Sequence, residues 1–151
     1  MTDDIMNHDI DLQRLVQFYQ SLSPESLPQV ATLYDPQARF KDPFNEVIGH
    51  APIVKIFEHM FRQLEAPRFV VTSSIAQGDQ AFLIWNFEFR MKRWNEAPQT
   101  IRGASHVRFG WNGLVLVHRD YWDPAEELYE KLPLLGGLMR WLKRRVNAPA
   151  R

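Results

Sequence analysis

Two aspartates lie in apolar segments where an acidic side chain is unexpected. Asp120 belongs to VLVHRDYWDP, whose β-branched and aromatic residues predict a buried strand. His118 precedes it by two positions, so both side chains should point to one face of that strand. Asp42 lies in RFKDPF, before a proline that keeps its backbone extended. Carboxylates in apolar surroundings can act as general acids or bases, so both aspartates are candidates for catalysis.

Asn86 and Glu88 extend this candidate set. In LIWNFEFRM they alternate with three aromatic residues, Trp85, Phe87 and Phe89. We expect the polar face of this strand to form the floor of an internal pocket beside Asp120. The aromatic face would then be exposed as a dimer surface. Two carboxylates in one apolar cavity resist double ionisation, so either Glu88 or Asp120 would be able to donate a proton.

Each candidate also has a structural interpretation. Asp42 could accept hydrogen bonds from the backbone amides of a turn. Asp120 could form an ion pair with Arg90 or Arg102, in which case Asp120→Asn would be destabilising. A pocket carboxylate without a cationic partner would instead tolerate the change near neutral pH. His118 is either a second proton carrier or a structural core histidine.

Hydrophobic periodicity identifies the elements that must position these residues. Apolar residues recur at helical spacing in three segments, 12–22, 27–34 and 52–64. A short strand is expected over 38–43, and a loop over 45–50. Longer strands are expected in four segments, 68–77, 81–94, 100–111 and 114–122. Asn112-Gly113 predicts a hairpin turn, and Asp123 with Pro124 predicts the start of a C-terminal helix.

Helices followed by hairpins are typical of a single α+β domain. We expect a cone-shaped, strongly curved antiparallel sheet wrapped around three N-terminal helices, with a further helix at the C-terminus. Residues 1–8 would be a flexible N-terminus, 9–132 the domain and 133–151 a helical extension with a solvated basic face. A pocket between helices and sheet would bind a small apolar or cyclic molecule. Its expected lining residues are Phe18, Tyr34, Phe57, Phe61, Ser105, His118 and Trp122.

Composition argues against several classes of function. The 151 residues suffice for one domain, and 18 basic against 18 acidic residues argue against nucleic acid as the main partner. The absence of cysteine excludes disulfides and thiolate catalysis. No metal-ligand spacing or phosphate-binding loop is evident, so we expect neither metal nor cofactor. No apolar run predicts a signal peptide or membrane span, which favours a cytoplasmic protein.

Two longer stretches resemble the SnoaL-like, nuclear-transport-factor-2-like superfamily, which includes ketosteroid isomerases, limonene epoxide hydrolases and polyketide cyclases. FYQSLSPESLPQVATLYDPQARFKDP is similar to the helix–helix–strand opening of the isomerases. HVRFGWNGLVLVHRDYWDP is similar to the final hairpin of the hydrolases and cyclases. The resemblance extends to about Leu132 and implies the fold described above, but this fold carries many different functions.

The resemblance to the isomerases implies an incomplete active site. Asp42 falls on their proton-shuttling base, whereas Phe18 and Ser105 fall on the tyrosine and aspartic acid of their oxyanion hole. Phe18 has no hydroxyl, and Tyr19 beside it is turned by about 100° on an ideal helix. The loss of these groups argues against steroid isomerisation.

The resemblance to the hydrolases and cyclases favours Asp120 as a catalytic residue. This residue falls on the last-strand aspartate of the hydrolases' Asp-Arg-Asp relay, and Asn86 and Glu88 fall on its other two members. The cyclases use an inward aspartate near this position as acid or base. We therefore expect a cofactor-independent, homodimeric isomerase, cyclase or hydrolase in which Asp42 or Asp120 moves a proton. A non-catalytic ligand-binding or protein-interaction domain of the same fold is the alternative.

Overall fold

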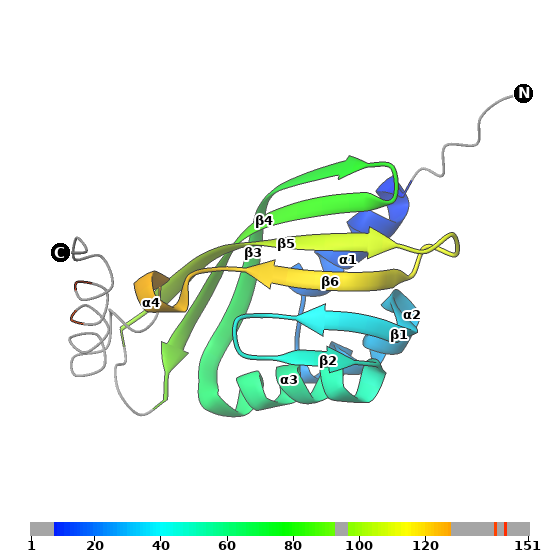
Figure 1. Cartoon of the computed structure of the whole chain (residues 1–151). Coiled ribbons are helices and arrows are strands. Elements are labelled where there is room, and N and C mark those ends of the chain that lie inside the picture. The colour runs from blue at the N-terminus through cyan, green and yellow to red at the C-terminus, as the bar shows by residue number, and fades with distance from the viewer. Residues whose placement is uncertain (1–7, 93–96, 128–140, 142–143, 145–151) are drawn as a thin grey trace, which may run out of the picture.

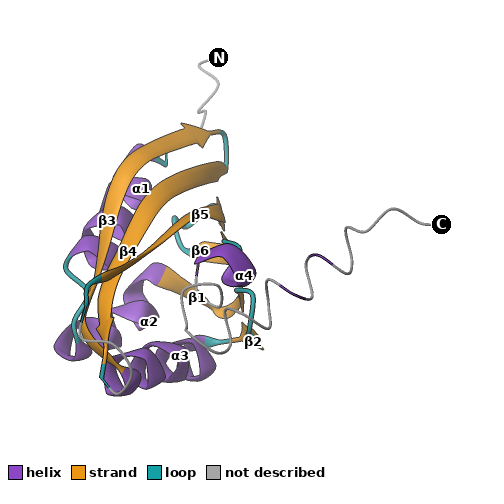
Figure 2. Ribbon diagram, turned by 90° about the vertical axis from the view of Figure 1, so that its left-hand side faces the viewer, coloured by secondary structure: helices purple, strands orange, loops and turns teal. Residues whose placement is uncertain are grey.

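The computed structural model describes residues 8–92, 97–127, 141 and 144 (Figure 1). The expectations for the flexible N-terminus and for most of the C-terminal extension lie outside these residues. Within the described part, the chain forms helices first and a large curved sheet afterwards, as an α+β domain. Figure 2 shows β3 and β4 as long, bent strands that curve over the helical side of the molecule. The predicted fold class is therefore confirmed.

The helical part packs against the inner face of the sheet. It comprises α1 (Asp9–Gln20), the 3-10 helix η1 (Pro24–Gln29), α2 (Val30–Leu33) and α3 (His50–Gln63). The predicted second helix is thus two short pieces, since Pro28 lies inside the 3-10 helix and Tyr34 already begins a strand. The buried face of α1 includes Phe18 and Tyr19, which follow the helical periodicity read from the sequence.

A single six-stranded sheet has the order β2-β1-β6-β5-β4-β3. Its strands are β1 (Tyr34–Lys41), β2 (Glu46–Ile48), β3 (Leu64–Gln77), β4 (Gln80–Met91), β5 (Gln99–Phe109) and β6 (Val115–Tyr121). The one-turn helix α4 (Pro124–Glu127) follows β6, and the Asp123 carboxylate accepts hydrogen bonds from its first amides. The predicted N-cap is thus present.

Two expectations about the sheet are wrong. The segment 45–50 contains the short strand β2, which pairs antiparallel with β1. The sheet is mixed because β1 and β6 pair in parallel, with Phe40 opposite His118. Hairpin signals predict only pairs of neighbouring strands. The β1–β6 pair joins segments separated by most of the domain, so no local signal could have predicted its direction.

The faces of β4 are the reverse of those expected. Trp85, Phe87 and Phe89 are only 5%, 8% and 4% exposed and belong to the core. The opposite, outer face carries Phe82 and Ile84, which are 47% and 46% exposed. Alternation predicts that a strand has two distinct faces, but it does not specify which one meets the helices. Here the helices cover the aromatic face, so those three residues cannot form an exposed dimer surface.

Candidate functional site

The inward face of β6 carries the candidate chemistry. His118 and Asp120 point to the same side, and His118 Nε2 lies 2.6 Å from Asp120 Oδ1. In the antiparallel register with β5, Asp120 is opposite Ser105, whose hydroxyl donates to the same Oδ1 at 2.5 Å. Trp85 Nε1 on β4 donates to Ser105 Oγ at 2.9 Å. Three adjacent strands therefore hold one carboxylate oxygen.

Two tyrosines complete this arrangement from the helical side. The Tyr34 hydroxyl lies 2.7 Å from His118 Nδ1, and the Tyr19 hydroxyl lies 2.5 Å from that of Tyr34. Tyr19 is also 3.4 Å from His118 Nδ1. We call the connected residues the Asp120 network; its members are Tyr19, Tyr34, Ser105, His118, Asp120 and Trp85.

Donor chemistry sets the direction of the Asp120 network. An indole N–H can only donate, so Ser105 accepts from Trp85 and directs its own proton to Asp120. On the other side every group is satisfied when Tyr19 donates to Tyr34 and Tyr34 donates to His118 Nδ1. In this arrangement His118 Nδ1 accepts from Tyr34, and the Nε2–H donates to the Asp120 carboxylate.

The two oxygens of Asp120 therefore have different roles. Within the described residues, every hydrogen bond to this carboxylate reaches Oδ1, and none reaches Oδ2. No enclosed side-chain oxygen or nitrogen of the described residues lacks a hydrogen-bond partner, so Oδ2 is not enclosed, and Asp120 lines the adjoining cavity. An ionised carboxylate can accept up to about four hydrogen bonds, so Oδ2 can still contact a ligand.

Burial keeps both tyrosines of the network protonated. Desolvation raises the pKa of Tyr34 and of Tyr19 far above the ordinary value of 10.0. The neighbouring Tyr34 and the negative charge of Asp120 raise the pKa of Tyr19 further. For Tyr34, the hydrogen bond with Tyr19 lowers the pKa in part, while Asp120 raises it. Both hydroxyls therefore remain donors at neutral pH.

A pocket of about 440 Å³ adjoins Asp120. Its walls are mainly apolar and come from β1, α3, β3, β4, β5 and the residue after β6. The apolar lining residues are Phe40, Phe44, Ile56, Phe57, Met60, Leu64, Phe69, Trp85, Phe87, Phe89, Met91, Ile101 and Trp122. The polar lining residues are Asp42, Asn45, His59, Gln63 and Asp120. This composition suits a small, mostly apolar molecule held by a few polar groups.

Gly103 on β5 makes room for one wall of the pocket. It is opposite Trp85 in the β4–β5 register, and a Cβ built at this position would lie 2.4 Å from the indole ring. Because no real side chain tolerates that distance, only glycine lets the ring of Trp85 lie across β5. The hydrogen bond from Trp85 to Ser105 then fixes the ring next to the Asp120 network.

The structure brings only some of the predicted pocket residues to the cavity. Asp42, Phe57, Asp120 and Trp122 line it. Tyr34, His118 and Ser105 lie behind Asp120 as members of the network. Phe18 is buried in the core and contacts Tyr19 and Phe57. Phe61 lines a separate surface depression with η1, beside Leu27 and Val54.

Asp42 borders the pocket but is engaged by its own turn. Its Oδ1 accepts hydrogen bonds from the backbone amides of Phe44 and Asn45 at 2.8 and 2.6 Å. The side-chain amide of Asn45 lies 3.1 Å from both carboxylate oxygens. The structural interpretation of Asp42 is thus confirmed, and its place in the pocket lining keeps it a candidate for catalysis.

Asn86 and Glu88 do not join Asp120. They lie on the outer face of β4, where Glu88 forms an exposed ion pair with Arg68 of β3 at 3.3 Å. The expected Glu–Asp pair is absent because Glu88 and Asp120 lie on opposite faces of the sheet. Arg102 is not a partner of Asp120 either, since its guanidinium binds the Glu127 carboxylate at 2.7 Å.

Tyr19 and Trp85 are the network members that the sequence-based assignment missed. On α1, Tyr19 does not share the direction of Phe18, and the alternation along β4 does not show that the face of Trp85 is buried. A signal was available for both, since a buried tyrosine hydroxyl or indole N–H almost always has a hydrogen-bond partner. The partner of such a group can be identified only from the fold, because Tyr19 and His118, for example, are 99 positions apart.

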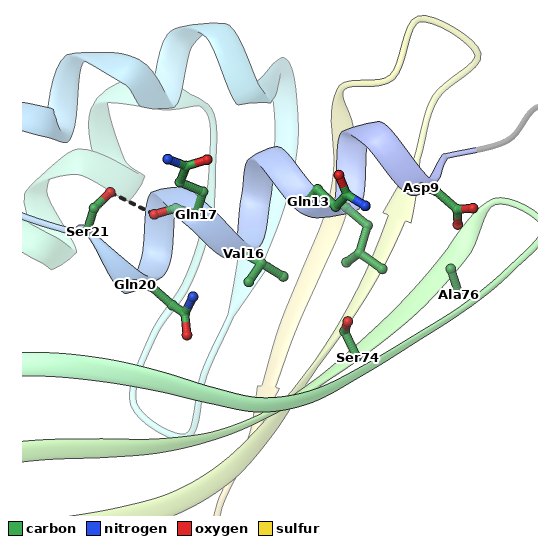
Figure 3. A pocket seen from close by; sticks show the side chains of 9 residues that line it. Asp9, Gln13, Val16, Gln17, Gln20, Ser21, Ser74 and Ala76 are labelled. Carbon is green, nitrogen blue, oxygen red and sulfur yellow. Dashed lines mark hydrogen bonds between the residues drawn. The ribbon is translucent and has the colours of Figure 1, made fainter.

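A second hollow lies between α1 and β3 (Figure 3). It measures about 640 Å³, and Figure 3 shows its largely polar lining, including Gln13, Gln17, Gln20 and Ser74. Gln20 Oε1 accepts a hydrogen bond from the Val71 amide, so the glutamine covers part of the β3 edge. The hollow contacts no member of the Asp120 network, and we place the candidate site in the smaller pocket.

The described residues contain neither a candidate metal-binding group nor a candidate membrane-spanning helix. Nowhere in 8–92 or 97–127 do three or more histidines and acids gather as a group that could hold a metal ion. None of the helices in the described part of the chain has the length and hydropathy that a bilayer crossing requires.

Solved structures with this fold place the chain in a known structural class. A protein with a ketosteroid isomerase-like fold from Catenulispora acidiphila, in complex with trimethylamine, superposes with a TM-score of 0.66 at 15% identity, covering 85% of this chain and 92% of that one. An NTF2-like protein from Burkholderia pseudomallei gives 0.68 at 18% identity, covering 77% and 92%. A candidate SnoaL-like polyketide cyclase from Shewanella putrefaciens gives 0.66 at 18% identity, covering 79% and 96%.

These neighbours show that the chain has an NTF2-like α+β fold. The sequence profile of the SnoaL-like domain matches residues 15–118, and the chain belongs to that family. No curated protein sequence matches the chain. The resemblance noted in the sequence is therefore confirmed at the level of family and fold.

Proposed function

We propose that this protein is a small-molecule enzyme of the isomerase, cyclase or hydrolase type, in which Asp120 transfers a proton within the apolar pocket. One observation carries the proposal: the network holds Asp120 Oδ1 with two hydrogen bonds and leaves Oδ2 without one from the described residues, while Asp120 lines the cavity. A general base needs a fixed position and one free lone pair, and this arrangement provides both. Family membership and a candidate cyclase among the structural neighbours support the same class.

The Asp120 network would assist the proton transfer by keeping the Asp120 carboxyl group in position. When Oδ2 takes a proton, His118 and Ser105 remain donors to Oδ1 and keep the carboxyl group oriented. Asp120 would then return the same proton at another position of the substrate, which isomerisation requires, while Asp42 borders the same cavity. The apolar walls would exclude water and hold the substrate by burial of its surface.

Solvent-deuterium incorporation tests the proposal without knowledge of the natural substrate. The protein would be incubated in D₂O with a panel of cyclic ketones, and exchange of hydrogens next to the carbonyl would be measured by mass spectrometry. We expect at least one ring-containing ketone to exchange faster than with heat-denatured protein. A parallel panel of cyclic epoxides would detect hydrolysis. If purified protein retains a small molecule but promotes no exchange or hydrolysis, the non-catalytic ligand-binding alternative is correct.

We further propose a homodimer that forms through the outer face of the sheet. Exposed apolar residues on neighbouring strands form a continuous patch there, comprising Ile75, Phe82, Ile84 and Tyr121. Contiguous apolar patches on a sheet usually mark an interface. The proposed dimer surface is thus this patch and not the face of β4 that carries Trp85, Phe87 and Phe89, which is buried.

The variant Phe82→Glu should weaken the dimer by at least about 10-fold, because it places a charge in the centre of a desolvated interface. Sedimentation velocity over a range of concentrations measures the effect. Trp111→Glu is the matched control, since Trp111 is 81% exposed at the tip of the β5–β6 turn. A wild-type monomer at all concentrations, or an equal effect of the two variants, would contradict this assignment.

A further inference from the structure

The charged and aromatic residues that line the pocket beside Asp120 also indicate the charge of its ligand. We propose that it prefers apolar ligands that end in a cation, of the organic amine class, over ligands of equal size that end in a carboxylate. This inference deepens the proposed function because it names the ligand class of the same pocket. It concerns binding alone, so it can hold or fail independently of proton transfer.

The charges that face the pocket are unevenly distributed. Among the described lining residues, Asp42 and Asp120 are carboxylates, His59 is the only residue able to carry a positive charge, and no lysine or arginine is present. The side chain of His59 is exposed, so solvent screens any charge it carries. The pocket therefore presents a negative field to its contents.

Nearby basic side chains are engaged outside the pocket. Lys92 donates to the backbone carbonyl of Arg62 at 2.9 Å, at the end of α3. Arg68 pairs with Glu88 on the outer face, and Lys41 pairs with Glu46 of β2 at 3.8 Å. These contacts direct positive charge away from the cavity. Within the described part of the chain, a carboxylate ligand would therefore meet Asp120 without a compensating cation, which is costly in apolar surroundings.

Asp120 itself is positioned to accept a cation. Its Oδ1 is occupied by Ser105 and His118, whereas Oδ2 has no hydrogen bond from the described residues, and Asp120 lines the cavity. An ammonium group has donors but no acceptors, so it complements this oxygen. A charge-assisted hydrogen bond of this kind is roughly twice as strong as one between neutral groups.

The aromatic walls favour the same class of ligand. Phe69 meets the indole of Trp85 edge-on with ring centroids 5.3 Å apart, and it stacks on Phe87 at 4.5 Å. All three line the pocket, as does Trp122. Aromatic faces attract cations, and the attraction is strongest for tryptophan and in desolvated sites. Because Trp85 is anchored to Ser105, its ring is held in place before a ligand binds.

Three probes of matched size test the inference. They are the amine 2-(1-naphthyl)ethylamine, the alcohol 2-(1-naphthyl)ethanol and the carboxylate anion of 1-naphthaleneacetic acid. Each is titrated into the protein at pH 7.5, and isothermal titration calorimetry gives its affinity. We expect the amine to bind at least about 10-fold more tightly than the alcohol. The carboxylate should bind at least about 10-fold more weakly than the alcohol, because the three probes differ mainly in the charge of their end group. In Asp120→Asn the amine should fall to within about 3-fold of the alcohol, because the ionic component of charge-assisted hydrogen bonding is lost.

Glu88→Gln is the matched control. It removes one negative charge from the outer face of the sheet and should leave all three affinities unchanged. Equal binding of amine and carboxylate to the wild type, or no binding of any probe, would overturn the inference. So would a preference for the amine that persists in Asp120→Asn. A protein that selects the amine through Asp120 but fails the deuterium-exchange test would sustain this inference and refute the proposed enzymatic role.

Discussion

Asp120→Asn is expected to reduce catalysed proton exchange by about 10²- to 10⁴-fold, which is the usual contribution of a general acid or base. The asparagine carbonyl oxygen can take the place of Oδ1 and accept the hydrogen bonds from Ser105 and His118. Its amide nitrogen then occupies the position of Oδ2, where it cannot accept a proton. We therefore expect a free energy of unfolding within about 1 kcal/mol of the wild type. Deuterium incorporation and thermal melts measure the two effects separately.

Asp120→Leu is the companion variant that separates chemistry from stability. Leucine has the same branching and the same number of side-chain heavy atoms but no acceptor, so it leaves the Ser105 hydroxyl and the His118 Nε2–H without a partner in a buried site. Each buried donor without a partner costs about 1–3 kcal/mol, so the variant should lose about 2–6 kcal/mol. A similar loss in Asp120→Asn would mean that Asp120 is the partner of a charged His118 in a structural ion pair, and our assignment of its role would be wrong.

Alkaline pH is expected to destabilise the protein steeply through its two buried tyrosines. Burial raises the pKa of Tyr19 and Tyr34 in the folded state, whereas the unfolded chain ionises them near the ordinary value of 10.0. Above that pH the unfolded state holds fewer protons than the folded state, so the free energy of unfolding decreases as pH rises. The stabilisation is fully present below about pH 10 and should be lost at up to about 1.4 kcal/mol per pH unit for each tyrosine.

Urea unfolding between pH 8 and 11.5 measures this slope. Tyr34→Phe should roughly halve the decrease, because one of the two linked groups is removed. That variant also loses the hydrogen bond to His118, so the slope rather than the absolute stability is the relevant quantity. Tyr121→Phe is the control, since Tyr121 is 48% exposed on the outer face. An unchanged slope in Tyr34→Phe would show that another group governs the alkaline transition.

Local patterns in the sequence determined much of the secondary structure and the place of the candidate chemistry. Helical periodicity predicts α1 and α3, Asn112-Gly113 predicts the β5–β6 turn, and Asp123 predicts the start of α4. The two-residue spacing of His118 and Asp120 places them on one face of the last strand, where they contact each other. Such features depend on residues close in sequence, and their conformational preferences are largely intrinsic to the chain.

The tertiary structure alone decided which face of β4 meets the helices and which partners Asp120 has. Alternation in LIWNFEFRM is compatible with either orientation, and only the packing of helices over the sheet buries Trp85 rather than Glu88. The parallel pairing of β1 with β6 then brings Tyr34 near His118. These contacts join residues separated by tens of positions, and their geometry follows from the closure of the whole sheet. No local propensity encodes that closure, so the network around Asp120 became visible only in the folded chain.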